Sequence, residues 1–244
     1  GFYADYQINP QIRVDFNYVG RYESHNSENP DFSELTNLLS GRLNYDGKGF
    51  YSNLEFVYKS NDALVEFGNV IDSRLFDGNA LLLNAGYFKS GLGIDASFRR
   101  LENMLFYTDR EKYNNIYNES IVNYLPALTK QHNFGLANIY VYQAQAGLSF
   151  LNEGKAGEIG QQIDIFYKYR KKNSLAERFK TIISFNYSSW FGLQAQYDLE
   201  NRSYKSDFLK YGEKYYQDFN LEIKNQWNPN WRTRVFYMRQ FYNL

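Results

Sequence analysis

The chain lacks several features that whole classes of protein depend on. None of its 244 residues is cysteine, which excludes a disulfide framework, a thiolate metal site and a cysteine nucleophile. Its 27 basic residues balance 27 acidic ones, so no net charge draws it to nucleic acid, and we expect no nucleic-acid partner. No apolar run reaches the roughly 18 residues of a transmembrane helix.

Aromatic residues are abundant instead. The chain has 24 Tyr, 20 Phe and 3 Trp, yet its mean hydropathy of -0.61 is that of a polar protein. A transmembrane β-barrel combines these properties, because lipid-facing and lumen-facing side chains alternate along each strand. Tyr and Trp also suit membrane interfaces, where the ring meets acyl chains and the polar tip stays wet. The alternative is a soluble β-sandwich or lectin rich in surface Tyr.

Apolar and polar residues alternate with a period of two in many segments. Ile12, Val14 and Phe16 alternate with Arg13 and Asp15, which is typical of a two-faced strand. Twelve strands are predicted in this way, at 2–8, 11–22, 37–46, 50–59, 80–89, 92–102, 133–151, 158–170, 180–190, 193–200, 214–227 and 231–242.

Short and long connections alternate between these strands. Tight-turn sequences occur at 9–10, 46–49, 90–91, 152–155 and 228–230, and longer polar segments at 23–36, 60–79, 103–132, 171–179 and 201–213. Outer-membrane barrels have short periplasmic turns and long external loops. If 133–151 is one strand, every tight turn lies on one side of the membrane, and both ends of the chain lie on the other side. Because such barrels normally start and end in the periplasm, this parity predicts an internal portion of a longer barrel.

The predicted fold is therefore all-β, an antiparallel up-and-down transmembrane β-barrel with about 12 strands in this chain, residues 1–244 forming a single domain of a larger barrel. Charged residues on the polar side of the strands are expected to line the lumen. The lining of a lumen contains both acidic and basic residues, because each buried charge must be paired with an opposite charge or hydrated. The lumen-lining candidates are Arg13, Asp15, Glu55, Lys59, Asp95, Arg99, Asp164, Lys168, Arg232 and Arg234.

No motif predicts catalysis, a metal or a cofactor. His25, Glu28 and Asp31 share one loop, but its spacing is not that of a calcium loop, and a solvated loop is the simpler interpretation. His132 stands without recognisable ligand partners. Acid pairs such as Glu55 and Asp95 are interpreted as lumen lining, with a hydrolase as the weaker alternative. We expect no enzyme.

The segment 103–132 is the longest predicted connection. It contains Tyr107, Tyr113, Tyr117 and Tyr124. Such a loop constricts a lumen, offers a contact surface or is a disordered external loop, and Tyr suits sugar or peptide contacts because it adds area at little entropic cost. These four residues are the candidate loop contacts.

Several stretches carry a family resemblance. They are Asn123–His132, with the sequence NYLPALTKQH, Gly157–Tyr167, with GEIGQQIDIFY, Tyr215–Ile223, with YYQDFNLEI, and Gln240–Asn243. Together they resemble an uncharacterised family of outer-membrane barrels of Bacteroidota over 123–244. The family's members are similar in being larger than this chain, and 143–156 departs from its pattern by being longer.

The resulting expectation is an outer-membrane β-barrel, structural or pore-like, with long extracellular loops. It would be located in the bacterial outer membrane, with the lipid bilayer or detergent as its immediate partner. Two alternatives remain open. One is a non-catalytic binding subunit of an outer-membrane complex, and the other is a soluble β-rich carbohydrate-binding protein.

Overall fold

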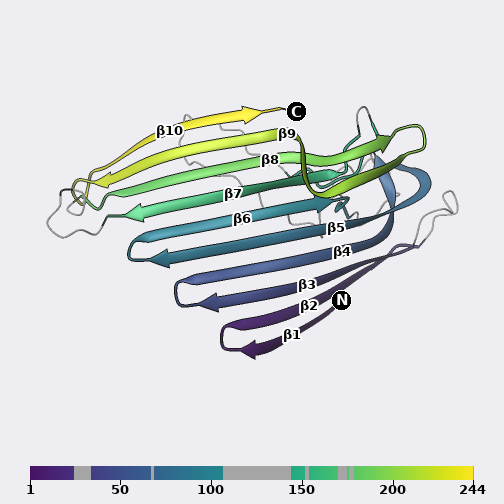
Figure 1. Cartoon of the computed structure of the whole chain (residues 1–244), viewed down its shortest axis with the longest axis horizontal. Coiled ribbons are helices and arrows are strands. Elements are labelled where there is room, and N and C mark those ends of the chain that lie inside the picture. The colour runs from purple at the N-terminus through teal and green to yellow at the C-terminus, as the bar shows by residue number, and fades with distance from the viewer. Residues whose placement is uncertain are drawn as a thin grey trace.

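The computed structural model of the chain is an antiparallel β-sheet (Figure 1). It describes residues 1–24, 34–66, 69–106, 144–151, 154–169, 175 and 179–243. The strands are β1 (Phe2–Asn9), β2 (Ile12–Tyr22), β3 (Leu35–Gly47), β4 (Phe50–Glu66), β5 (Asn69–Lys89), β6 (Leu92–Glu102), β7 (Gly157–Lys168), β8 (Ile182–Asp198), β9 (Ser203–Gln226) and β10 (Arg232–Tyr242).

The ten strands form one sheet in which each strand pairs with its neighbours in the chain, in the order β1 to β10. This confirms the prediction of an all-β, antiparallel, up-and-down arrangement. The sheet is not closed: β1 and β10 are its two edges and do not pair with each other. Closure into a barrel therefore stays a prediction.

The predicted count of twelve strands is wrong for two reasons. The expected strands 180–190 and 193–200 are one continuous strand, β8. The expected strand 133–151 lies partly outside the described residues, and its described part, 144–151, contains only one isolated bridge, between Ser149 and Lys155.

Phe191 and Gly192, which separate the two expected strands, lie in a bulged part of β8. The register between β8 and β9 shifts at Trp190/Phe191, Phe191/Leu193 and Leu193/Ala195. A bulge bends a strand and increases its twist without ending it. Glycine is needed here because a Cβ on Gly212 would lie 2.9 Å from the carbonyl oxygen of Leu193.

Two segments predicted as loops, 60–79 and 201–213, belong mainly to long hairpins. They extend β4 and β5, and begin β9. Their strands were missed because both faces carry polar residues, and the alternation signal requires one apolar face. Asp62 illustrates this: its side chain is buried and pairs with Arg21 at 3.1 Å.

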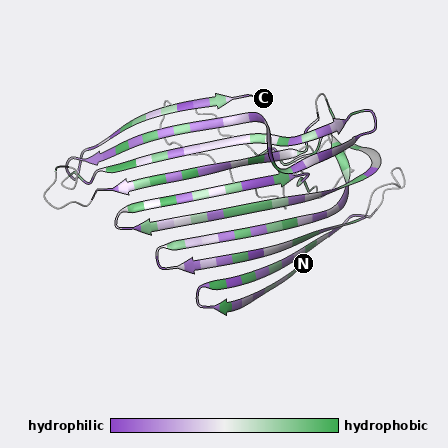
Figure 2. Cartoon of the chain, viewed as in Figure 1, coloured by the Kyte–Doolittle hydropathy of each residue, from purple (hydrophilic) through white to green (hydrophobic). Residues whose placement is uncertain are grey.

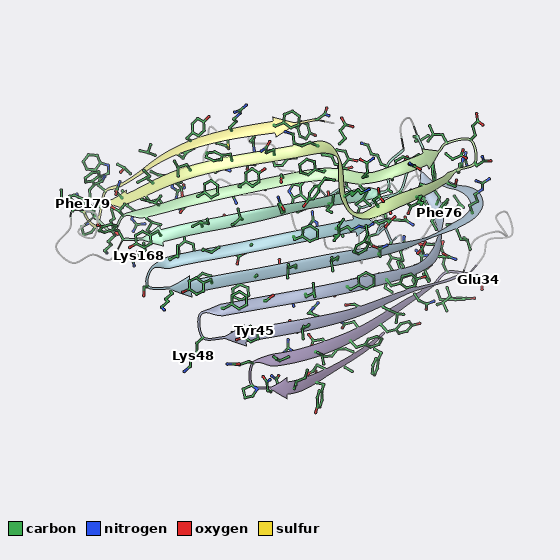
Figure 3. The ribbon with its side chains drawn as sticks, in the orientation of Figure 1. Glu34, Tyr45, Lys48, Phe76, Lys168 and Phe179 are labelled. Atoms are coloured by element: carbon green, nitrogen blue, oxygen red, sulfur yellow. The ribbon has the colours of Figure 1, made fainter. Side chains whose placement is uncertain are left out.

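The two ends of the sheet differ. The tight connections after β1, β3 and β5 lie at one end, and the connections after β2, β4, β6 and β8 lie at the other, together with both termini (Figure 1). Two placements were wrong: the end of β7 and the start of β8, between which the long loop 171–179 was predicted, lie at the tight-turn end, and Gly154 and Lys155 of the predicted tight turn 152–155 precede β7 at the opposite end. Figure 3 shows Lys48, Lys168 and Phe179 at the tight-turn end and Phe76 far from them.

Local chemistry fixes the tight turns. Asn9 and Asn228 each precede a proline, and the side-chain oxygen of each accepts two backbone N–H bonds, from Gln11 and Ile12 and from Asn230 and Trp231. Such Asx turns reverse the chain without a helix. In the β5–β6 turn Ser90 and Gly91 both have positive φ, 51° and 92°, as a two-residue hairpin of the type favoured by strand twist requires.

Candidate functional site: the polar face of the sheet

The register places all ten predicted lumen residues on one face of the sheet, which we call the polar face. One continuous row of cross-strand neighbours joins Asp15, Arg42, Glu55, Leu82 and Arg99. Further rows and the period of two add the remaining candidates: Arg13, Lys59, Asp95, Asp164, Lys168, Arg232 and Arg234. That this face lines a lumen stays a prediction.

Away from the end that carries the long hairpins, the burial of the two faces is opposite to that of a soluble sheet. Along β9 the polar-face side chains Asp218, Asn220 and Glu222 are 0%, 2% and 2% exposed, whereas their apolar neighbours Leu221 and Ile223 are 39% and 38% exposed. Figure 2 shows hydrophilic and hydrophobic residues alternating along the strands. The large exposed side chains of the other face, the apolar face, include Phe16, Leu39, Leu43, Leu54, Phe56, Leu83, Ile183, Val235 and Tyr237.

Buried charges on the polar face are paired. Arg99 Nη2 lies 2.6 Å from Glu158 Oε1, both side chains are at most 1% exposed, and the guanidinium stacks over the Trp190 ring at 4.7 Å. Nearer the first strand, Arg42 contacts Glu55 at 2.9 Å. Pairing of this kind is what a charge needs when it is removed from bulk water. Glu158 was not among the predicted lumen residues, although it is the first residue of the predicted strand 158–170.

The predicted acid pair Glu55 and Asp95 is not brought together. Glu55 accepts hydrogen bonds from Ser40 and Arg42, and Asp95 accepts one from the Tyr51 hydroxyl. Asp95 instead lies directly opposite Asp164 in the β6–β7 register. Asp164 accepts a 2.8 Å bond from Asn186, so hydrogen bonds offset the repulsion expected between facing acids.

Both described ends of the β6–β7 connection pack on the polar face. The side chains of Met104 and Ala146 form a cluster with Ala80 and Leu101, and the Met104 N–H donates to the Ala146 carbonyl at 2.7 Å. The Lys59 ammonium, 1% exposed, donates to the Leu105 carbonyl at 2.9 Å. Further along the connection, Leu148 and Phe150 form a second cluster with Ile159, whose side chain lies on the apolar face, so the described parts of the connection pack on both faces at this end of the sheet.

Five cations meet at the tight-turn end of the polar face, which we call the basic cluster. They line a hollow of about 400 Å³ formed by the adjacent ends of β7, β8, β9 and β10. The only acid near them among the described residues is Glu222, which lies 2.8 Å from Lys224 and 3.2 Å from Arg234. The basic cluster consists of Lys168, Lys180, Lys224, Arg232 and Arg234.

The basic cluster thus unites Lys168, Arg232 and Arg234, which were predicted as lumen residues, with two lysines that were not selected. Lys180 and Lys224 lie in the predicted strands 180–190 and 214–227 but were not selected as lumen residues. The signal that identifies Lys224 is the register Lys168–Ile182–Lys224–Arg234, and Lys180 lies two residues before Ile182 of that row, so both require correct strand pairing. Such a concentration of positive charge attracts anions.

At the opposite end of the sheet the β8–β9 hairpin closes with a hydrogen-bonded turn. The Asn201 backbone N–H and side-chain amide donate to the Asp198 carboxylate at 2.9 and 2.8 Å. These bonds favour the charged form and hold the pKa of Asp198 below its usual value. The Asp198 carboxylate therefore stays negative in this exposed turn under neutral conditions.

Comparison with known proteins identifies the family. The sequence matches a family of unknown function, DUF6029, over residues 6–244. The chain belongs to the DUF6029 family. The match extends well beyond the range 123–244 in which the sequence resemblance was found. No curated protein and no solved structure matches the chain.

The family assignment brings no site residues to this DUF6029 member. In the described part of the chain, no three His, Asp or Glu side chains gather as metal ligands do. A search of the same residues for a helix long and apolar enough to span a membrane found none. The candidates His25, Glu28, Asp31, His132, Tyr107, Tyr113, Tyr117 and Tyr124 lie outside the described residues.

Proposed function

We propose that this DUF6029 chain forms the wall of a bacterial outer-membrane β-barrel, with its apolar face toward lipid and its polar face toward an aqueous lumen that passes small solutes. The opposite burial of the two faces carries this proposal. A soluble sheet of this size buries its apolar face, because exposed contiguous apolar surface favours aggregation. Contact with lipid removes that penalty, and strands of alternating apolar and polar residues give barrels their lipid-facing surface.

The dimensions of the apolar face fit a bilayer. Between Gln217 and Trp227 the chain advances about ten residues, roughly 33 Å of strand, which at a barrel tilt of about 40° spans roughly 25 Å. That is the height of the apolar band of outer-membrane barrels. The sequence order from Gln217 through Leu221 and Ile223 in β9 to Trp227, directly after that strand, supports a band bounded at both ends.

Aromatic residues gather at the tight-turn end, as expected at a membrane interface. Tyr45 packs against Phe50 with ring centroids 5.8 Å apart, and Phe179 packs against Trp227 at 4.6 Å. Trp231 is 62% exposed in the β9–β10 turn. Tyr and Trp favour this level because their rings are amphipathic. The tight-turn end would thus face the periplasm, and the longer hairpins the outside.

The charges of the polar face support its lumen-facing role. Paired charges such as Arg99 and Glu158 neutralise each other where little water reaches them, and the basic cluster at the periplasmic end favours passage of anions. A binding subunit of a membrane complex would share the same wall. A soluble carbohydrate binder would leave the large exposed side chains of the apolar face, such as Leu221 and Ile223, in contact with water.

The test compares insertion of the wild-type chain with that of two arginine variants of β9. Leu221→Arg lies near the middle of the proposed band and should cost about 2–4 kcal/mol of folding free energy in phosphatidylcholine vesicles. Leu209→Arg makes the same change at a 58% exposed position beyond the band and should have little effect. Heat-modifiable gel migration reports the folded fraction, and solute release from vesicles reports the pore.

Either of two results would overturn the proposal. One is a wild-type protein that is monomeric and soluble without detergent. The other is equal insertion of Leu221→Arg and Leu209→Arg. A wild type that inserts without releasing solute, and co-purifies reproducibly with envelope proteins, would support the binding subunit in place of the pore.

A further inference from the structure

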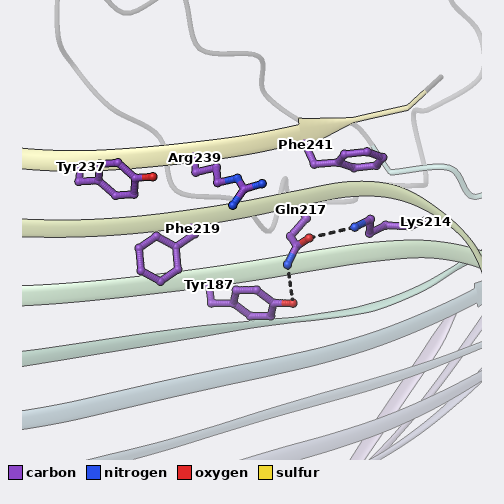
Figure 4. A pocket seen from close by; sticks show the side chains of 7 residues that line it. All are labelled: Tyr187, Lys214, Gln217, Phe219, Tyr237, Arg239 and Phe241. Atoms are coloured by element: carbon purple, nitrogen blue, oxygen red, sulfur yellow. Dashed lines mark hydrogen bonds between the residues drawn. The ribbon is translucent and has the colours of Figure 1, made fainter.

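A hollow lies on the apolar face across β8, β9 and β10, toward the end of the sheet that carries the long hairpins (Figure 4). Its volume is about 430 Å³. Four aromatic rings and two cations line it: Tyr187, Phe219, Tyr237, Phe241, Lys214 and Arg239. The register sets Tyr187 opposite Phe219, and Phe219 opposite Arg239, so a guanidinium stands in the middle of an aromatic surface.

A chain of contacts holds the Lys214 ammonium over the hollow. Its Nζ lies 4.2 Å from the centre of the Phe241 ring and donates to Gln217 Oε1 at 3.1 Å. The Gln217 amide in turn donates to the Tyr187 hydroxyl at 3.1 Å (Figure 4). An ammonium group has three N–H donors, so one that contacts a ring and donates to one amide still has a donor available for a ligand.

Neither cation has a carboxylate partner in the described part of the chain. The ion pairs of β9 and β10 involve Glu222 and Asp207, not Lys214 or Arg239. The adjacent acid, Glu213, accepts a 2.7 Å bond from Asn243. In a lipid-facing wall, two cations that line one hollow without a carboxylate partner are costly unless an anion joins them. The missing charge is therefore negative.

The level of the hollow fits a lipid headgroup. On the apolar face, the row Gln161–Ser189–Gln217 marks the point where polar residues replace Leu221 and Ile223. In a barrel wall this is the boundary between acyl chains and headgroups. Cations at that boundary bind lipid phosphates by charge-assisted hydrogen bonds.

We infer that this hollow is a binding site for a phosphate-bearing lipid of the surrounding membrane. The phosphate lies between Lys214 and Arg239, and the acyl chains run over Phe219 and Tyr237 toward the apolar band. The inference rests on the proposed membrane-wall function and adds the class of lipid that this part of the wall selects. Phosphate alone would leave the aromatic surface uncovered, so the occupant is the lipid rather than the free ion.

The experiment measures lipid adducts of the full chain by native mass spectrometry in a neutral detergent. Phosphatidylglycerol and phosphatidylcholine are the two probes. We expect wild-type protein to retain phosphatidylglycerol preferentially, and Lys214→Gln/Arg239→Gln to lose that preference by about tenfold, since two charge-assisted contacts are removed. The control Lys48→Gln/Lys89→Gln removes two exposed cations at the tight-turn end and should match wild type.

Three results would overturn the site: unchanged phosphatidylglycerol adducts in the double variant, displacement of the lipid by millimolar inorganic phosphate, or a lipid-free dimer that occupies this face. If the double variant does not fold, Arg239→Gln alone is measured, with a smaller loss expected. Vesicle insertion separates the two proposals. Wild type that inserts without preferring phosphatidylglycerol contradicts only the lipid site, and wild type that does not insert contradicts the membrane wall.

Discussion

Single side chains on the polar face are buried with their charges intact. Arg99, Glu158 and Lys59 are each at most 1% exposed, and each has a partner within hydrogen-bonding distance. Removing one member of such a pair leaves the other charged in a site with little water, which costs more than the pair itself contributes. The stability of the wall therefore depends on residues that face away from the lipid.

The substitution Glu158→Gln tests this dependence. The neutral amide leaves the Arg99 guanidinium without its carboxylate, and we expect the free energy of unfolding to fall by about 3–5 kcal/mol. Urea titration of the protein in vesicles, followed by tryptophan fluorescence, measures the change. The control Asp207→Asn breaks the exposed Lys210–Asp207 pair and should change stability by less than about 1 kcal/mol. Equal effects of the two substitutions would contradict a buried role for Glu158.

At the scale of the strands, alternation predicted most of the sheet and failed where its physical basis is absent. It located β1, β2, β6 and β10 closely, because one face of each carries large apolar residues. It missed the outer parts of β4, β5 and β9, where both faces are polar, and it divided β8 at a bulge. The polar face was predictable, since period two assigns it directly. The basic cluster was not predictable, because only the strand register brings Lys180 and Lys224 to the other cations.

A glycine in one of the tight turns can be tested by substitution. Gly49 has φ +81°, and a Cβ there would lie 2.8 Å from the Phe88 carbonyl oxygen. Gly49→Ala should therefore destabilise the β3–β4 turn by about 1–3 kcal/mol. Gly41→Ala is the matched control, because a Cβ on Gly41 meets nothing within 4 Å. Refolding yield in vesicles compares the two, and a lower yield for Gly41→Ala than for Gly49→Ala would contradict this account of the turn.

At the scale of the whole molecule, charge is distributed unevenly although the chain is neutral. The basic cluster concentrates five cations at the tight-turn end of the polar face, with Glu222 as the acid that pairs with two of them. In a lumen this arrangement raises the local concentration of anions at one mouth. The proposed pore should thus prefer anions even without net charge.

Bilayer recordings of the full chain measure that preference as a reversal potential in a KCl gradient. We expect chloride to permeate better than potassium, and Lys168→Gln/Arg232→Gln to lower the permeability ratio several-fold, since a charge about 4 Å from the path contributes roughly 1 kcal/mol in water. The pair Lys48→Gln/Lys89→Gln serves again as control, being at the same end of the sheet but outside the basic cluster. A cation-selective wild type would rule out this role for the basic cluster.

In the proposed wall the apolar face meets lipid and the polar face does not. Spin labels at single cysteines along β9, from 218 to 223, test it directly, because the chain has no other thiol. In vesicles we expect high oxygen collision rates and low nickel-complex collision rates at 219, 221 and 223, with low oxygen collision rates at 218, 220 and 222. A profile without the period of two, or nickel accessibility at 221 and 223, would contradict it.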